Sequence, residues 1–203
     1  MILKNYQLNK INFKDNKLFL LYGKNEGLKK QAVKEITTNR KNIVNYHEKE
    51  ILDNSPVFLE ELSSKSLFDN ERVIIIKRVT DKILNVVNEI KELLLDDVVI
   101  IFIAEILEKR SKLRTFFEKD KKNICIPFYP DNEQTLSKLA FDYFKIKNIP
   151  ISYANINLII NKCNGDREIL LNELVKLEYF SKNGKKLTPD KLSRLVNLTE
   201  DYS

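Results

Sequence analysis

Five short apolar segments alternate with amphipathic segments along the first two-thirds of the chain. Each apolar segment is five to seven residues long and rich in Ile, Val, Leu and Phe. Strands that are apolar on both faces need helices on both sides, and long crossovers between successive strands force parallel pairing. The pattern therefore predicts an α/β fold, a five-stranded parallel sheet with helices on both faces. The predicted strands span residues 17–23, 42–46, 72–77, 98–104 and 124–129.

The segments between these strands repeat their apolar residues with the period of an α-helix. A further stripe follows the fifth strand and ends before Pro150, which disfavours a helical residue in front of it. We therefore expect the first domain to span residues 1–147. Its helical stripes are Leu28, Ala32 and Ile36; Val79, Ile83, Val86, Val87, Ile90 and Leu94; Leu113, Phe116 and Phe117; and Leu136, Leu139, Ala140, Tyr143 and Phe144.

Beyond Pro150 the strand patterns stop and three helical stripes follow. Gly165-Asp166, Asn183-Gly184 and Thr188-Pro189 are typical of helix breaks, turns and N-caps. Residues 148–203 are therefore expected to form a small lid domain of three helices.

The net charge of +6 is consistent with a nucleic-acid partner but does not establish one. Only 7 of the 35 basic residues are Arg, the residue favoured for bidentate phosphate contacts. Dispersed Lys side chains favour solvated surfaces over a dedicated DNA groove. Because no apolar run is long enough to cross a bilayer and the N-terminus lacks a signal-peptide pattern, we expect a cytoplasmic protein without a membrane partner.

The residues that most often carry metal or acid-base chemistry are few and scattered. Cys125 and Cys163 lie in apolar patterns without a second ligand at metal spacing, so both are expected to be reduced core thiols. His47, the only histidine, ends a predicted strand and is interpreted as a solvated residue. Glu105 follows a central strand without a second carboxylate at acid-base spacing. No catalytic residue, metal or cofactor is predicted.

The first strand, a glycine-containing turn and a helix occupy the place of a phosphate-binding loop, with the turn GKNEGLKK at 23–30. A working loop has the form G-x-x-x-x-G-K-[ST]. Here Gly23 and Gly27 are one residue too close, Lys24 lies between them, and no Ser or Thr follows. The third strand ends on Lys77-Arg78, where Mg²⁺ would need oxygen ligands. We therefore interpret the turn as a degenerate phosphate loop.

The segment SLFDNERVIIIKR at 66–78 combines an apolar pair with a strand. Ser66 precedes Leu67 and Phe68, and polar residues flank the pair on both sides. One aliphatic and one aromatic side chain could form the anchors of a protein interface. They could also pack beneath the sheet, which the residues alone favour.

Four segments together resemble the delta subunit of the bacterial DNA polymerase III clamp loader. They are FLLYGKNEGLKK, ELSSKSLFDNERVIIIKR, VVIIFIAEILEKRSKLRTFFEK and NGDREILLNELVKLEYF. The resemblance implies an AAA+-like fold with a degenerate P-loop. Members of the family continue into a helical collar domain, whereas the sequence as given stops at Ser203 just past the second expected domain, so assembly through a collar is not assumed.

The resemblance also implies a role. It makes the chain a non-catalytic subunit of the DNA-directed DNA polymerase holoenzyme, which binds the sliding clamp (beta subunit) and opens its ring without hydrolysing ATP. Ser66, Leu67 and Phe68 would contact the clamp, and the pair would enter a hydrophobic pocket there. The other implied partners are the gamma/tau and delta prime subunits and primed DNA.

Four basic residues at the start of one predicted helix keep other functions open. Lys109, Arg110, Lys112 and Arg114 would face either primed DNA or a neighbouring subunit within a loader. Alternatively, they would serve a stand-alone DNA-binding module, whose affinity would fall steeply with salt. An NTPase of the P-loop class is a further alternative, which the degenerate loop argues against.

Overall fold

The computed structural model describes residues 16–38, 40–64, 72–93, 97–182, 184 and 186–196. The chain divides into two compact units, Met1–Pro130 and Asp131–Ser203. Within the described ranges, no helix combines the length and the apolar character needed to cross a membrane.

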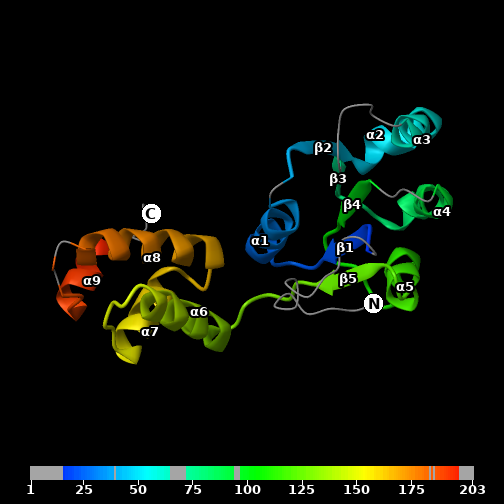
Figure 1. Cartoon of the computed structure of the whole chain (residues 1–203). Helices are drawn as coiled ribbons and strands as arrows, with labels where there is room; N and C mark the ends of the chain where they lie inside the picture. Colours follow the sequence, from blue (N-terminus) through cyan, green and yellow to red (C-terminus); the bar gives the residue numbers. More distant parts are fainter. Residues whose placement is uncertain are drawn as a thin grey trace. The chain divides into compact units, whose positions relative to one another are not determined.

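The first unit is built on a parallel sheet, which confirms the predicted fold class (Figure 1). Its strands are β1 (Leu18–Tyr22), β2 (Asn42–His47), β3 (Arg72–Lys77), β4 (Val98–Ile103) and β5 (Ile124–Pro127), in the order β2-β3-β4-β1-β5. All four pairings are parallel. β1 is buried along its whole length, as a central strand covered on both faces must be.

Helices cover the two faces of the sheet unequally. Of the helices described in this unit, α1 (Glu26–Thr37) packs on one face, and the others pack on the opposite face (Figure 1). The second group consists of α2 (Glu48–Asp53), α3 (Ser55–Ser63), α4 (Leu84–Glu92) with the preceding 3₁₀ turn η2 (Asp81–Ile83), and α5 (Lys112–Lys119). The sequence pattern did not predict α2 and α3, because both are short and Asn54 separates them.

The alternation of side chains along each strand divides the core into two layers. Ile75 and Ile101 lie in the layer under α1, whereas Ile76 and Phe102 lie in the opposite layer. Because a single helix covers the first face, part of that face at the edge strand β2 remains open. Ile43, Asn45 and His47 alternate along β2 as exposed residues on this side.

The second unit is helical. It contains α6 (Glu133–Ile146), α7 (Tyr153–Lys162), α8 (Arg167–Lys182) and α9 (Pro189–Leu195). The predicted boundary at 147/148 is wrong, because Leu136 and Phe144 of α6 pack in one core with Ile156, Leu170 and Leu174. The break at Pro150 ends a helix but not a domain, so the described part of this unit has four helices instead of the expected three.

A buried ion pair also links the segment just before α6 to the start of α8. The guanidinium of Arg167 donates to both oxygens of Asp131, with Nε–Oδ2 at 2.7 Å and Nη2–Oδ1 at 2.8 Å. The two side chains are only 11% and 6% exposed. Removing one partner of such a pair leaves an uncompensated buried charge, so this pair fixes the entry to α6 against the start of α8.

This division of the core predicts which fragment folds alone. A fragment of residues 131–203 is expected to be helical and to unfold cooperatively, because it keeps the whole core of the second unit. A fragment of residues 148–203 is expected to lose cooperativity, because loss of a buried Phe such as Phe144 alone commonly costs about 3–5 kcal/mol. Far-UV circular dichroism during heating measures the helix content and the cooperativity of unfolding of each fragment. Equal cooperativity of the two fragments would restore the boundary at 147/148.

Candidate functional site

The turn between β1 and α1 packs directly on protein backbone. Gly23 has φ +126°, and its amide donates to the carbonyl oxygen of Glu105 at 2.7 Å. A Cβ atom at this position would lie 2.1 Å from the carbonyl oxygen of Phe128, so only glycine fits. Lys24, which follows, is exposed to solvent, and Gly27 lies in the first turn of α1.

Several backbone amides of this turn, those of Asn25, Glu26, Leu28 and Lys29, already have acceptors. In a working phosphate loop such amides point at the phosphates of the nucleotide. Here they donate to carbonyl and side-chain oxygens of the protein, and the Asn25 side chain donates to Tyr129. The bonds run from Asn25 N to Phe128 O (3.3 Å), Glu26 N to Lys24 O (3.0 Å), Leu28 N to Asn25 Oδ1 (3.0 Å), Lys29 N to Asn25 O (3.1 Å) and Asn25 Nδ2 to Tyr129 O (3.2 Å). A nucleotide would have to break these bonds to bind as it does in a P-loop.

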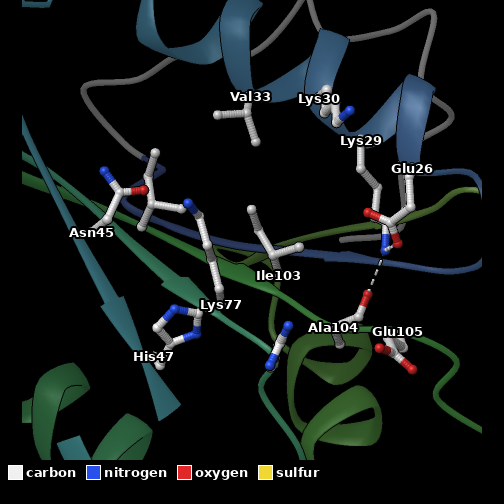
Figure 2. A pocket seen from close by; sticks show the side chains of 12 residues that line it. Glu26, Lys29, Lys30, Val33, Asn45, His47, Lys77, Ile103, Ala104 and Glu105 are labelled. Carbon is white, nitrogen blue, oxygen red and sulfur yellow. Dashed lines mark hydrogen bonds and ion pairs between the residues drawn. The ribbon is translucent and has the colours of Figure 1, made fainter. Parts of the chain in front are cut away.

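Lys29 is held inside the protein. Its side chain is 2% exposed, and its Nζ donates to the carbonyl oxygen of Ala104 at 2.9 Å (Figure 2). The same atom pairs with Oε1 of Glu26 at 2.6 Å. This lysine therefore joins α1 to the residue after β4 and is not directed at a ligand. The sequence showed the lysine but not its acceptor, which lies 75 positions away.

The carboxyl end of β3 is cationic. β3 ends at Lys77, and Arg78 follows it. Glu105, which lies just beyond β4, is exposed. Among the residues that the structure describes, no group of three or more His, Cys, Asp and Glu side chains is placed to hold a metal ion. Divalent cations prefer carboxylate oxygens, so this edge of the sheet suits anions better than metals.

Both cysteines are packing residues. Cys125 and Cys163 are buried free thiols. Burial raises the pKa of Cys125 to about 12 and that of Cys163 to about 11. Because the thiolate is the reactive form, neither thiol is activated as a nucleophile.

Ser66, Leu67 and Phe68 lie outside the described residues, but both flanks of their segment are described. Arg72, at the start of β3, reaches back to the end of α3. Its Nη2 donates to the carbonyl oxygens of Leu62 at 3.0 Å and Ser64 at 3.3 Å. A cation at these last carbonyls also interacts favourably with the helix dipole. The two flanks of residues 65–71 are therefore held together, a role for Arg72 that the sequence did not indicate.

The four basic residues near the start of α5 differ in their exposure to solvent. Lys109, Arg110 and Lys112 are exposed. Arg110 pairs with Glu108 on the surface at 2.7 Å. Arg114 turns inward, with its side chain only 17% exposed.

Three partners hold the Arg114 guanidinium. Its Nε lies 2.7 Å from Oε1 of Glu118, its Nη1 donates to the carbonyl oxygen of Leu107 at 3.2 Å, and its Cζ lies 5.1 Å from the centre of the Tyr22 ring. Arg114 is thus part of the fold of this region and is not placed to contact a partner.

Asp81 fixes the start of the same helix. It accepts from the hydroxyl of Ser111 at 2.6 Å and from the amides of Leu113 and Lys112, each at 3.0 Å. Burial alone would raise the pKa of Asp81, but these hydrogen bonds outweigh it and hold that pKa below its ordinary value. A charged carboxylate therefore positions the exposed cations. Ser111 has the sequence signature of an N-cap, whereas Asp81 carries no comparable signal.

Together these features define the class of the first unit, a parallel α/β fold whose β1–α1 turn is closed on the protein's own backbone. A sequence model of the DNA polymerase III delta subunit family matches residues 19–126, from β1 to β5. Because the match covers more than half of the chain, the chain belongs to this family.

Solved structures agree with this fold. The Bacillus subtilis DNA clamp loader delta protein (YqeN) matches with a TM-score of 0.67 and 18% identity, over 96% of this chain and 61% of that one. The Thermotoga maritima RuvB Holliday junction branch migration motor matches with a TM-score of 0.52 and 14% identity, over 90% of this chain and 64% of that one. The chain thus spans less than two-thirds of either protein, and at these identities the similarity shows the fold. No curated protein matches the chain.

The close approach at Gly23 predicts an unequal effect of two glycine substitutions. Gly165→Ala is the matched control, because Gly165 also has a positive φ (+70°) but only Leu136 Cδ1 near the new Cβ, at 4.0 Å. The control should lose roughly 1–2 kcal/mol from the left-handed backbone alone. Gly23→Ala should lose about 1–3 kcal/mol more, because its Cβ overlaps a carbonyl oxygen. Hydrogen exchange of core amides in the affected unit measures each loss. Equal losses would show that the turn is not closed on Phe128.

Proposed function

We propose that this chain is a clamp-loader subunit of the bacterial replicative polymerase. It binds the sliding clamp (beta subunit) through Leu67 and Phe68, with Ser66 beside them, and opens the ring without hydrolysing ATP. Membership of the delta subunit family carries the proposal, because the match at residues 19–126 includes this segment. The closed turn at Gly23 and the inward Lys29 support the non-hydrolytic part.

The proposed mechanism is differential binding. A ligand shifts an equilibrium only as far as its affinities for the two states differ, so the contacts must favour the open clamp interface over the closed one. A few large anchors dominate most interfaces, and fully burying a Leu or Phe side chain contributes roughly 1.5–3 kcal/mol. A Leu-Phe pair therefore supplies enough free energy to bias an interface that is itself close to balance.

The hydrogen bonds of Arg72 support the proposal that Leu67 and Phe68 are presented to the clamp on a segment with fixed ends. They join the end of α3 to the start of β3, which bracket residues 65–71. A segment with both ends fixed loses less conformational entropy on binding than a free one. Preorganisation of this kind raises affinity without any added contact.

The other partners follow from the same role. Within the loader we propose gamma/tau and delta prime as neighbouring subunits and primed DNA as a further ligand. Lys109, Arg110 and Lys112 are the proposed contacts to DNA or to a neighbour, because they are exposed at the start of α5. Arg114 is left out because its side chain turns inward and its guanidinium is held by Glu118 and Leu107. The chain would act in the cytoplasm as a non-catalytic subunit of the polymerase holoenzyme.

A stand-alone DNA-binding module is the second candidate, and the same three exposed cations favour it. The pair between Arg110 and Glu108 and the inward direction of Arg114 reduce the positive charge that duplex DNA would meet. We therefore rank clamp binding first.

The test is calorimetric titration of the chain against the sliding clamp from the same source. The Leu67→Ala/Phe68→Ala variant should bind at least about 30-fold more weakly, since loss of one such anchor commonly costs about 2 kcal/mol. Val57→Ala/Ile106→Ala is the matched control, because these side chains are also exposed, at 53% and 59%. The control should bind like the unchanged chain.

The other outcomes separate the alternatives. Equal binding by both double variants, with circular dichroism unchanged, would move the clamp contact away from Leu67 and Phe68. No clamp binding by the unchanged chain, together with duplex binding that falls steeply with salt, would favour the DNA-binding module. Turnover of ATP by the isolated chain would revive the NTPase alternative.

A further inference from the structure

A groove of about 420 Å³ lies on the surface of the second unit, between α6 and α7. The two helices share the core of this unit and pack side by side (Figure 1). Both helices contribute side chains to the lining, and five of its seven residues are polar or charged. The groove therefore suits a ligand that forms hydrogen bonds better than a purely apolar one.

The helical period arranges the lining residues in rungs across the groove. Residues four apart lie on one face of a helix, about 6 Å apart along its axis. Phe141 of α6 contacts Tyr153 of α7, and one turn along, the hydroxyl of Ser137 reaches Oδ1 of Asn157 at 3.5 Å. An aromatic rung therefore lies beside a rung made of a hydroxyl and an amide.

One face of the Tyr153 ring is covered and the other is open. The Phe141 ring stacks on it, with the ring centroids 5.2 Å apart and the planes 3° from parallel. Tyr153 is nevertheless 64% exposed, which a ring covered on both faces would not reach. Phe141 itself packs against the core and supports Tyr153 from the protein side. An aromatic face that is held open to solvent is a stacking surface for a second flat ring.

The backbone that carries Tyr153 is fixed by hydrogen bonds within the second unit. Ser152 caps the start of α7, because its side chain accepts from the amide of Asn155 at 3.2 Å. The side chain of Asn155 is buried and donates to the carbonyl oxygen of Leu187 at 3.0 Å. A ring that is positioned in advance loses less conformational entropy when a ligand stacks on it.

Polar side chains next to the aromatic rung can bind the edge of such a flat ring. Asn157 and Gln134 each carry an amide, which offers both donors and an acceptor. Lys138 lies one helical turn from Gln134 and adds a cation, and Glu133 lies one turn from Ser137 and adds a carboxylate. Nucleobases combine a flat ring with donors and acceptors along their edges, so they match this lining.

We propose that this groove binds an unpaired base of a single-stranded nucleic acid. The base stacks on the open face of Tyr153, its edge meets Asn157 and Gln134, and Lys138 contacts the adjoining phosphate. A base inside a duplex is covered on both faces by its neighbours, so the groove takes only a base that has left the stack. The site lies outside the unit that carries residues 66–68 and does not depend on the proposed clamp contact.

The test is calorimetric titration of the full chain with a short oligothymidylate, at roughly 0.2 M salt, where contacts to phosphate alone are weak. Tyr153→Ala should weaken binding at least about fivefold, because it removes the stacking surface for one base. Tyr153→Phe keeps the ring and should bind like the unchanged chain. Tyr179→Ala is the matched control, because Tyr179 is 65% exposed and lies on α8, outside the groove. It should also bind like the unchanged chain.

An abasic strand of the same length separates stacking from charge. It keeps the sugars and phosphates but has no base to stack, so Tyr153→Ala and the unchanged chain should bind it equally. A duplex of the same length should likewise show no difference between the two proteins. Because Tyr153 lies at the surface, the circular dichroism of its variants should match that of the unchanged chain.

Several results would overturn the proposal. These are equal losses in Tyr153→Ala and Tyr179→Ala, an equal loss in Tyr153→Phe, a matching loss for the abasic strand, displacement of the oligothymidylate by a neutral oligosaccharide such as maltohexaose, and no binding by the unchanged chain at millimolar concentration. Tyr153→Ala should titrate the sliding clamp like the unchanged chain. Failure of this site and failure of the clamp contact are therefore distinguishable.

Discussion

The packing of the β1–α1 turn against the carbonyl of Phe128 is the constraint on which the first unit depends. It forces glycine at position 23 and directs the amide of Asn25 to the same carbonyl. Lys29 completes the closure by donating to Ala104. A turn of the kind that binds phosphate in a working P-loop here packs on its own protein, and the sheet keeps its architecture with this turn closed on Phe128.

A closed turn suits a binding module. The helix α1 and the ends of β1, β4 and β5 are joined by direct hydrogen bonds, so the scaffold is complete without a ligand. On the other face, Arg72 joins α3 to β3, and Asp81 holds the start of α5. Surface segments that bind partners work best on such fixed supports, because less conformational entropy is lost on association.

Much of the fold could be predicted from the sequence, because apolar strands covered on both faces have a clear pattern. The domain boundary could not be predicted in this way. The apolar stripe at Leu136 shows that α6 has an apolar face, but it does not show which of the two cores that face joins. The departure of residues 23–30 from the P-loop motif could be recognised in the sequence, whereas the carbonyl acceptor of Lys29 could not. The basic cluster was also visible, but only the structure turns Arg114 inward. For the clamp contact, Leu67 and Phe68 remain a prediction from the resemblance.

Hydrogen exchange of the amides of the β1–α1 turn, with and without Mg-ATP, tests most directly whether this unit is a binding module with a closed loop. The amides of Gly23, Asn25, Leu28 and Lys29 donate to protein acceptors, so they should be protected without nucleotide. Mg-ATP should leave their exchange rates unchanged. Fast exchange that slows when Mg-ATP is added would show an open loop that binds nucleotide, and would contradict the closed turn.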